Sequence, residues 1–99
     1  MTSINMVINY MPRFRREYKK LPINIRALLK TQELLFRADP FDKKLATHKL
    51  KGRLKNYWAF SIDQKFRVMF TFHDDEIDFV STGDHRIYDM FQEFPQKYT

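Results

Sequence analysis

The sequence predicts an α+β fold of two layers, in which a helical hairpin covers one face of an antiparallel sheet and the other face stays open. Three observations lead to this prediction. Apolar residues occupy every second position near the start of the chain and through its last third, which is the period of a strand. Over residues 13–38 they lie three or four positions apart, which is the period of a helix. Prolines at 22 and 40 mark helix boundaries, so the expected order is β-α-α-β-β-β.

The first strand is predicted over residues 4–10 and is short. Its side chains alternate between apolar residues and residues that should face away from the core. The apolar set is Ile4, Met6, Ile8 and Tyr10.

Two helices are predicted over residues 13–38. In the first, Phe14 and Tyr18 share one face, and arginines and lysines fill the outer face. Pro22 can close this helix and also occupy the first turn of the next. Pro40 disfavours helical geometry at the preceding residue, so the second helix should end there. The apolar stripe of the second helix is Ile25, Leu28, Leu29, Leu35 and Phe36.

Residues 39–56 are expected to form a polar and basic connection, longer than is usual in a small domain unless the loop has a function. Three strands are predicted after it, over 57–63, 66–73 and 76–82, as an antiparallel meander. The helices should cover the aromatic side of these strands, which carries Trp58, Phe60, Phe66, Phe70 and Phe72. Arg67 would then project from the open face.

The length and composition restrict the class of protein. Ninety-nine residues predict a single domain over 1–99. The absence of cysteine excludes disulfides, a thiol nucleophile and a cysteine-based zinc site, and three scattered histidines predict neither a metal nor a cofactor. No apolar run approaches the ~20 residues that span a membrane, and the N-terminal segment has no signal-peptide pattern. We therefore expect a cytoplasmic protein without a membrane partner.

Charge is distributed unevenly along the chain. Residues 1–57 hold fourteen basic and four acidic residues, a net charge of +10, whereas residues 58–99 carry −4. A basic excess in one part of a small domain predicts an anionic partner, such as nucleic acid, an acidic protein or an anionic surface. The alternative is a charged, solvated surface that serves solubility alone.

The candidate site is a sparse set of imidazole, basic and phenol side chains. Its members are His48, Lys49, Lys51, Arg53, Lys55, Arg67, His85, Arg86 and Tyr88. This set suits RNA cleavage without a metal, because two imidazoles can serve as base and acid near neutral pH. Arginine and lysine can stabilise the charge that develops on the phosphate, and an exposed tyrosine ring can stack on an unpaired base.

These residues also have interpretations without catalysis. A single histidine is most often a surface or structural residue, and a basic segment can bind phosphate without any reaction. Arg67 can form a salt bridge across the sheet with Asp63 or Asp78. These alternatives stay open at the level of sequence.

Four segments, taken in order, resemble the RelE/ParE superfamily of toxin–antitoxin toxins, with the nearest likeness to the RelE/StbE and YafQ types. They are Lys49-Leu50-Lys51-Gly52, the strand from Tyr57 to Ile62, Phe66-Arg67-Val68, and Gly83-Asp84-His85-Arg86-Ile87-Tyr88. The resemblance implies a RelE-like fold and a ribosome-dependent mRNA endonuclease that arrests translation. It also implies an acidic antitoxin as partner, in a hetero-oligomer that can bind operator DNA through the antitoxin.

The resemblance further implies roles for single residues. Arg67 matches the strand arginine that contacts the scissile phosphate, and His85 matches a C-terminal histidine proposed as general acid. His48 falls where related toxins place an acid/base residue. The less specific matches are Lys49 and Lys51, at basic positions, and Tyr88, at an aromatic one. Our hypothesis takes His48 as base and His85 as acid, although sequence alone leaves that order open.

The sequence departs from the YafQ pattern before its third strand, where Ser61 and Lys65 replace an expected histidine and aspartate. The RelE and YoeB types lack that pair as well. The superfamily also contains ParE-like toxins that inhibit DNA gyrase and cleave no RNA, and these generally lack the acid/base set. The presence of both His48 and His85 therefore favours a nuclease, and an inactive homologue that acts with its antitoxin in autorepression is a further alternative.

Overall fold

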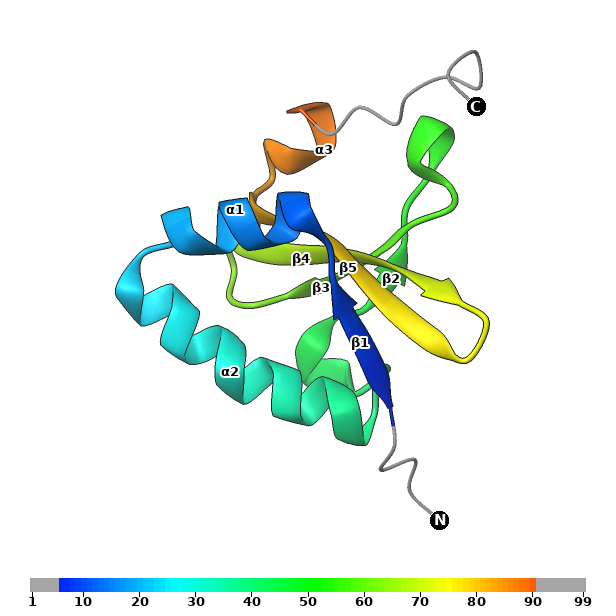
Figure 1. Ribbon diagram of the computed structural model, residues 1–99, viewed down its shortest axis with the longest axis horizontal. Helices are drawn as coiled ribbons and strands as arrows, with labels where there is room; N and C mark the ends of the chain where they lie inside the picture. Colours follow the sequence, from blue (N-terminus) through cyan, green and yellow to red (C-terminus); the bar gives the residue numbers. More distant parts are fainter. Residues whose placement is uncertain (1–5, 91–99) are drawn as a thin grey trace.

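Proline positions set the limits of the helical hairpin in the computed structural model, which describes residues 6–90. Helix α1 (Pro12–Lys20) begins at a proline, which suits the first turn because no backbone N–H is needed there. Helix α2 (Ile23–Ala38) follows after Pro22, and the residue before Pro40 is extended, as expected. The predicted hairpin is confirmed, and Figure 1 shows both helices on one side of the sheet.

A five-stranded sheet forms the second layer, in the order β1-β5-β4-β3-β2. Its strands are β1 (Val7–Tyr10), β2 (His48–Lys49), β3 (Trp58–Ser61), β4 (Phe66–His73) and β5 (Glu76–Asp84). The predicted α+β class and the meander of β3, β4 and β5 are confirmed. The sheet is mixed, however, and not antiparallel throughout. Strand β1 lies parallel to β5, because the helical hairpin carries the chain across the sheet before the meander begins.

The connection over 39–56 is more structured than the sequence predicts. It contains the 3₁₀ turns Lys43–Leu45 and Gly52–Leu54, and between them the short strand β2 pairs with β3 at the edge of the sheet. Leu45 and Leu54 are buried and anchor the two turns. Their burial offsets the entropy that ordering the segment costs.

The main core lies between the helices and the aromatic side of the sheet. The ring of Phe36, from α2, stacks on Phe60 with 4.8 Å between centroids and meets Phe70 edge-on at 5.0 Å. All three residues are buried, so the aromatic face is core as predicted. Phe72 differs, because 43% of it is exposed at the end of β4, where it contacts Trp58.

The opposite face of the sheet is only partly open. Leu54, Met69 and Ile87 form a second buried cluster there, with Tyr57 and Tyr88 packed against it. Ile87 belongs to the short helix α3 (Ile87–Met90). The face that the sequence predicts to be open is therefore covered at its middle by the second 3₁₀ turn and α3. Within residues 6–90, no helix is long and apolar enough to cross a membrane.

Candidate active site

Strand register places His48 and Arg67 on the same face of the sheet. His48 pairs with Ala59 of β3, and two residues further along β3 Ser61 pairs with Arg67 of β4. Cross-strand partners point to the same face, and so do residues two apart on one strand. From strand spacings, the Cα atoms of His48 and Arg67 are roughly 12 Å apart. Two long side chains can therefore reach one substrate from opposite sides.

His85 reaches the same end of the sheet from β5. Gly83 pairs directly with Arg67, and His85 lies two residues further on, in the exposed turn that leads into α3. The backbone N–H of Tyr88 donates to the carbonyl of His85 at 3.1 Å and so closes that turn. Register thus brings together the three residues that the sequence proposes for catalysis.

The imidazole of His48 is exposed, and its Nδ1 lies 3.0 Å from the carbonyl oxygen of Ala46. A carbonyl only accepts hydrogen bonds, so in the neutral ring Nδ1 carries the proton and Nε2 carries the free lone pair. This tautomer suits a general base. Lys49 follows His48 on β2, and strand alternation directs it to the other face.

The guanidinium of Arg67 is half-buried beside Tyr88 and makes few hydrogen bonds. Its Nη2 donates to the carbonyl of Gln64 at 3.2 Å. The Nε of Arg67 is buried and has no acceptor among the described residues. The hydroxyl of Tyr88 is also buried and lies beside this guanidinium, which can only donate to it, so its own O–H has no acceptor there either. Burial raises the pKa of Tyr88 and the charge of Arg67 offsets part of that rise, so the hydroxyl stays neutral at physiological pH. Two buried donors without acceptors form a site that an anionic oxygen would satisfy.

The alternative in which Arg67 forms a salt bridge with Asp63 or Asp78 is not found. The Asp63 carboxylate accepts hydrogen bonds from backbone N–H groups, including that of Phe66 at 2.6 Å. The Asp78 carboxylate accepts from Asn9 at 2.8 Å and lies 3.6 Å from the ring of His73. His73 therefore lies at the turn between β4 and β5, at the end of the sheet opposite to Arg67.

The guanidinium of Arg86 pairs with Asp84 and not with the group around Arg67. Its Nε and Nη2 hold the carboxylate of Asp84 at 2.9 Å each. Hydrogen bonds from Arg86 lower the pKa of Asp84 to about 2, so this pair is ionised over the physiological range. Both residues line a separate cavity of about 300 Å³ between α1 and β5, together with Lys20 and Phe66.

The basic residues of the connection divide into two kinds. Arg53 is structural, because its Nη2 donates to the carbonyl of Tyr88 at 2.7 Å and ties the second 3₁₀ turn to α3. Lys49, Lys51 and Lys55 are exposed, and within the described part of the chain they form no salt bridge. Those three lysines are free to contact a phosphate backbone.

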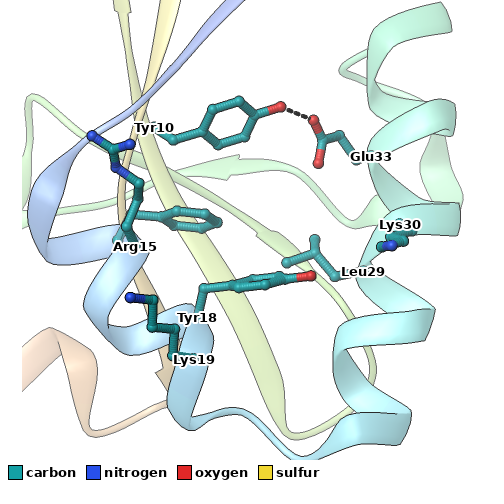
Figure 2. A pocket seen from close by; sticks show the side chains of 8 residues that line it. Tyr10, Arg15, Tyr18, Lys19, Leu29, Lys30 and Glu33 are labelled. Atoms are coloured by element: carbon teal, nitrogen blue, oxygen red, sulfur yellow. Dashed lines mark hydrogen bonds between the residues drawn. The ribbon is translucent and has the colours of Figure 1, made fainter.

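A groove on the helical side was not foreseen from the sequence. It lies between α1 and α2 and has a volume of about 400 Å³ (Figure 2). Its walls are mainly aromatic and aliphatic, from Tyr10, Phe14, Tyr18 and Leu29, and its charged lining residues are Arg15, Lys19, Lys30 and Glu33. The Tyr10 hydroxyl donates to the Glu33 carboxylate across one end (Figure 2). An apolar groove lined by more cations than anions suits an acidic amphipathic segment.

Sequence reasoning also missed Glu17. Its carboxylate accepts hydrogen bonds from β5 next to the candidate site. One signal was present in the sequence, since Glu17 is the only acidic residue in an otherwise basic α1.

Comparison with known proteins identifies the family. The sequence model of the family described as "Bacterial toxin of type II toxin-antitoxin system, YafQ" matches residues 6–91. The comparison with curated proteins found no match. A copper-bound mutant toxin from Helicobacter pylori is 25% identical, with 87% of this chain and 99% of that chain covered and a TM-score of 0.69.

Two toxin–antitoxin complexes share the fold. The Escherichia coli DinJ-YafQ complex gives 20% identity, coverage of 90% and 100%, and a TM-score of 0.65. The Staphylococcus aureus YoeB-YefM complex gives 20%, coverage of 82% and 98%, and a TM-score of 0.65. The family that the sequence suggested is confirmed, and the chain belongs to the YafQ family of type II toxin–antitoxin toxins.

Proposed function

We propose that this toxin is a ribosome-dependent mRNA endonuclease that cuts by acid/base chemistry without a metal. The observation that carries the proposal is the convergence of His48, Arg67 and His85 at one end of the sheet through strand register. The two unpaired donors on Arg67 and Tyr88 support it, because a phosphate oxygen is an acceptor of the required charge.

The proposed reaction begins at the ribose 2′-hydroxyl. Nε2 of His48 takes the proton, and the 2′-oxygen forms a bond to phosphorus. The bond from phosphorus to the 5′-oxygen then breaks, and His85 protonates the departing oxygen, which leaves a 2′,3′-cyclic phosphate. Arg67 stabilises the extra charge on the phosphate as it develops.

Binding of the RNA chain falls to the exposed lysines of the connection. Lys51 and Lys55 provide positive charge along the β2 side of the site, and among the described residues they form no competing salt bridge. Lys49 lies on the other face of β2 and adds positive charge at that edge of the sheet. The ring of Tyr88 is half-buried against the second cluster and is not free to stack on a base. Its proposed role is to donate a hydrogen bond from its hydroxyl beside Arg67.

An acidic antitoxin is the proposed protein partner, in a toxin–antitoxin hetero-oligomer. The DinJ-YafQ and YoeB-YefM structures are toxin–antitoxin complexes with this fold. The groove between α1 and α2 offers apolar walls beside Arg15, Lys19 and Lys30, which fits an acidic segment with apolar anchors. This groove lies on the helical face, and the catalytic residues lie on the opposite face of the sheet.

The test is translation of a defined mRNA in vitro with purified ribosomes, with 5′ ends mapped by primer extension. Wild-type protein should give cuts that require ribosomes, and His85→Ala and Arg67→Ala should each abolish them while keeping antitoxin binding. His73→Ala is the matched histidine control, because His73 lies at the far hairpin, and it should cut like wild type. Intact mRNA with wild-type protein would contradict the proposal, and a DNA gyrase supercoiling assay would then decide for the ParE-like alternative.

A further inference from the structure

The Glu17 carboxylate joins helix α1 to strand β5. Its Oε1 accepts hydrogen bonds from the Ser81 hydroxyl at 2.7 Å and from the Thr82 backbone N–H at 3.1 Å. Its Oε2 pairs with Nε of Arg13 at 3.1 Å. Only 19% of the side chain is exposed. A carboxylate with three donors in such a position is strongly oriented.

Strand β5 needs this carboxylate because its neighbour is too short. Strand β1 pairs with residues 76–79 of β5 and no further. Beyond Phe79 no strand of the described residues 6–90 lies beside the outer edge of β5, so without Glu17 the Thr82 N–H would lack an acceptor there. Glu17 supplies the acceptor that a longer β1 would have supplied.

The same stretch of β5 contacts Arg67 on β4 and leads into the turn that carries His85. The Thr82 hydroxyl donates to the backbone carbonyl of Arg67 at 2.8 Å. Gly83 pairs with Arg67, and His85 comes two residues later. A continuous series of hydrogen bonds therefore runs from Glu17 through Thr82 to Arg67, and the position of His85 depends on the same strand end.

We propose that Glu17 is a positioning residue of the candidate active site. Its carboxylate lies within the fold and fixes the end of β5, which sets the distance between Arg67 and His85. The inference rests on the proposed nuclease function for its catalytic consequence. Because a misplacement of about 1 Å can cost about 100-fold in rate, loss of these bonds should lower kcat and leave KM nearly unchanged.

Three substitutions of Glu17 distinguish whether kcat depends on the position of the accepting oxygen or on the negative charge of the carboxylate. Glu17→Gln keeps an oxygen at the place of Oε1 and should retain most of the wild-type kcat. Glu17→Asp keeps the charge but draws the oxygens back by one methylene, and it should lose kcat, as Glu17→Ala does. Glu76→Ala is the matched control, since the Glu76 carboxylate accepts a hydrogen bond from the Asn9 side chain at 2.9 Å at the opposite end of β5, and it should cut like wild type.

Amide chemical shifts supply a readout that does not depend on cleavage. In Glu17→Asp and Glu17→Ala, the amides of Thr82, Gly83 and His85 should shift, while those of α2 stay in place. Unchanged shifts at these amides, or equal kcat for Glu17→Asp and wild type, would overturn the inference. If wild-type protein cuts no message, the nuclease proposal fails by itself, and the amide shifts still decide the role of Glu17.

Discussion

The guanidinium of Arg53 donates a hydrogen bond of 2.7 Å to the backbone carbonyl of Tyr88. The two residues are 35 positions apart in the chain. The bond connects the basic connection, which holds the free lysines, to the short helix that holds Tyr88 beside Arg67. A residue predicted to bind RNA therefore also serves to hold two parts of the site together.

Arg53→Ala should loosen α3. A hydrogen bond from a charged donor typically contributes about 1.5–3 kcal/mol, so amide exchange at Tyr88 should become at least about tenfold faster. Lys51→Ala is the control, because Lys51 is an exposed cation of the same segment and forms no salt bridge with any residue that the structure describes. Hydrogen exchange followed by NMR measures the effect. Equal exchange rates in the two variants would show that the bond contributes nothing to the stability of α3.

Phe36→Ala should cost most of the stability of the fold. Phe36 is completely buried and contacts Phe60, Phe70 and Phe79. Loss of a buried phenylalanine typically costs about 3–5 kcal/mol in the free energy of unfolding. Leu34→Ala lies on the same helix with 70% exposure and should cost less than about 0.5 kcal/mol. Urea unfolding followed by circular dichroism compares the two, and similar losses would contradict the packing described.

Gly83→Ala should displace α3. A Cβ atom at residue 83 would lie 2.7 Å from Cγ2 of Ile87, whereas a Cβ at Gly52 would meet no atom within 4 Å. Overpacking of this kind typically costs about 1–3 kcal/mol. Ile87→Ala should therefore cost less in the Gly83→Ala background than in wild type. A double-mutant cycle from urea unfolding measures that difference, and strict additivity would contradict the clash.

The ion pair of Asp84 and Arg86 should give a stability difference that depends on pH. The pKa of Asp84 falls from 3.8 to about 2 on folding, because Arg86 stabilises the charged form. Its contribution is therefore complete above the unfolded pKa and is lost as pH falls through about 2. The urea midpoints of wild type and Asp84→Asn should differ at neutral pH and converge at about pH 2. Asp75→Asn, in the exposed turn, is the control, and a difference that persists at about pH 2 would contradict the assignment.

The sequence by itself determined the helical hairpin and the antiparallel meander. The period of the apolar residues and the prolines at 22 and 40 act through neighbours in the chain, so these elements can be derived without tertiary contacts. The same local patterns identified the aromatic face as core and selected Arg67 as a residue of the opposite face. The family-like segments then identified His48 and His85 as candidates.

Only the tertiary structure decided how these elements meet. The parallel pairing of β1 with β5 joins segments about 70 positions apart, and no local pattern encodes it. The covering of Met69 by Leu54 and Ile87, and the hydrogen bonds of Glu17, also depend on residues far apart in the chain. Periodicity fixes which face a side chain occupies. Which partner it finds there depends on long-range packing, and that packing determines which of the candidate residues are free to act.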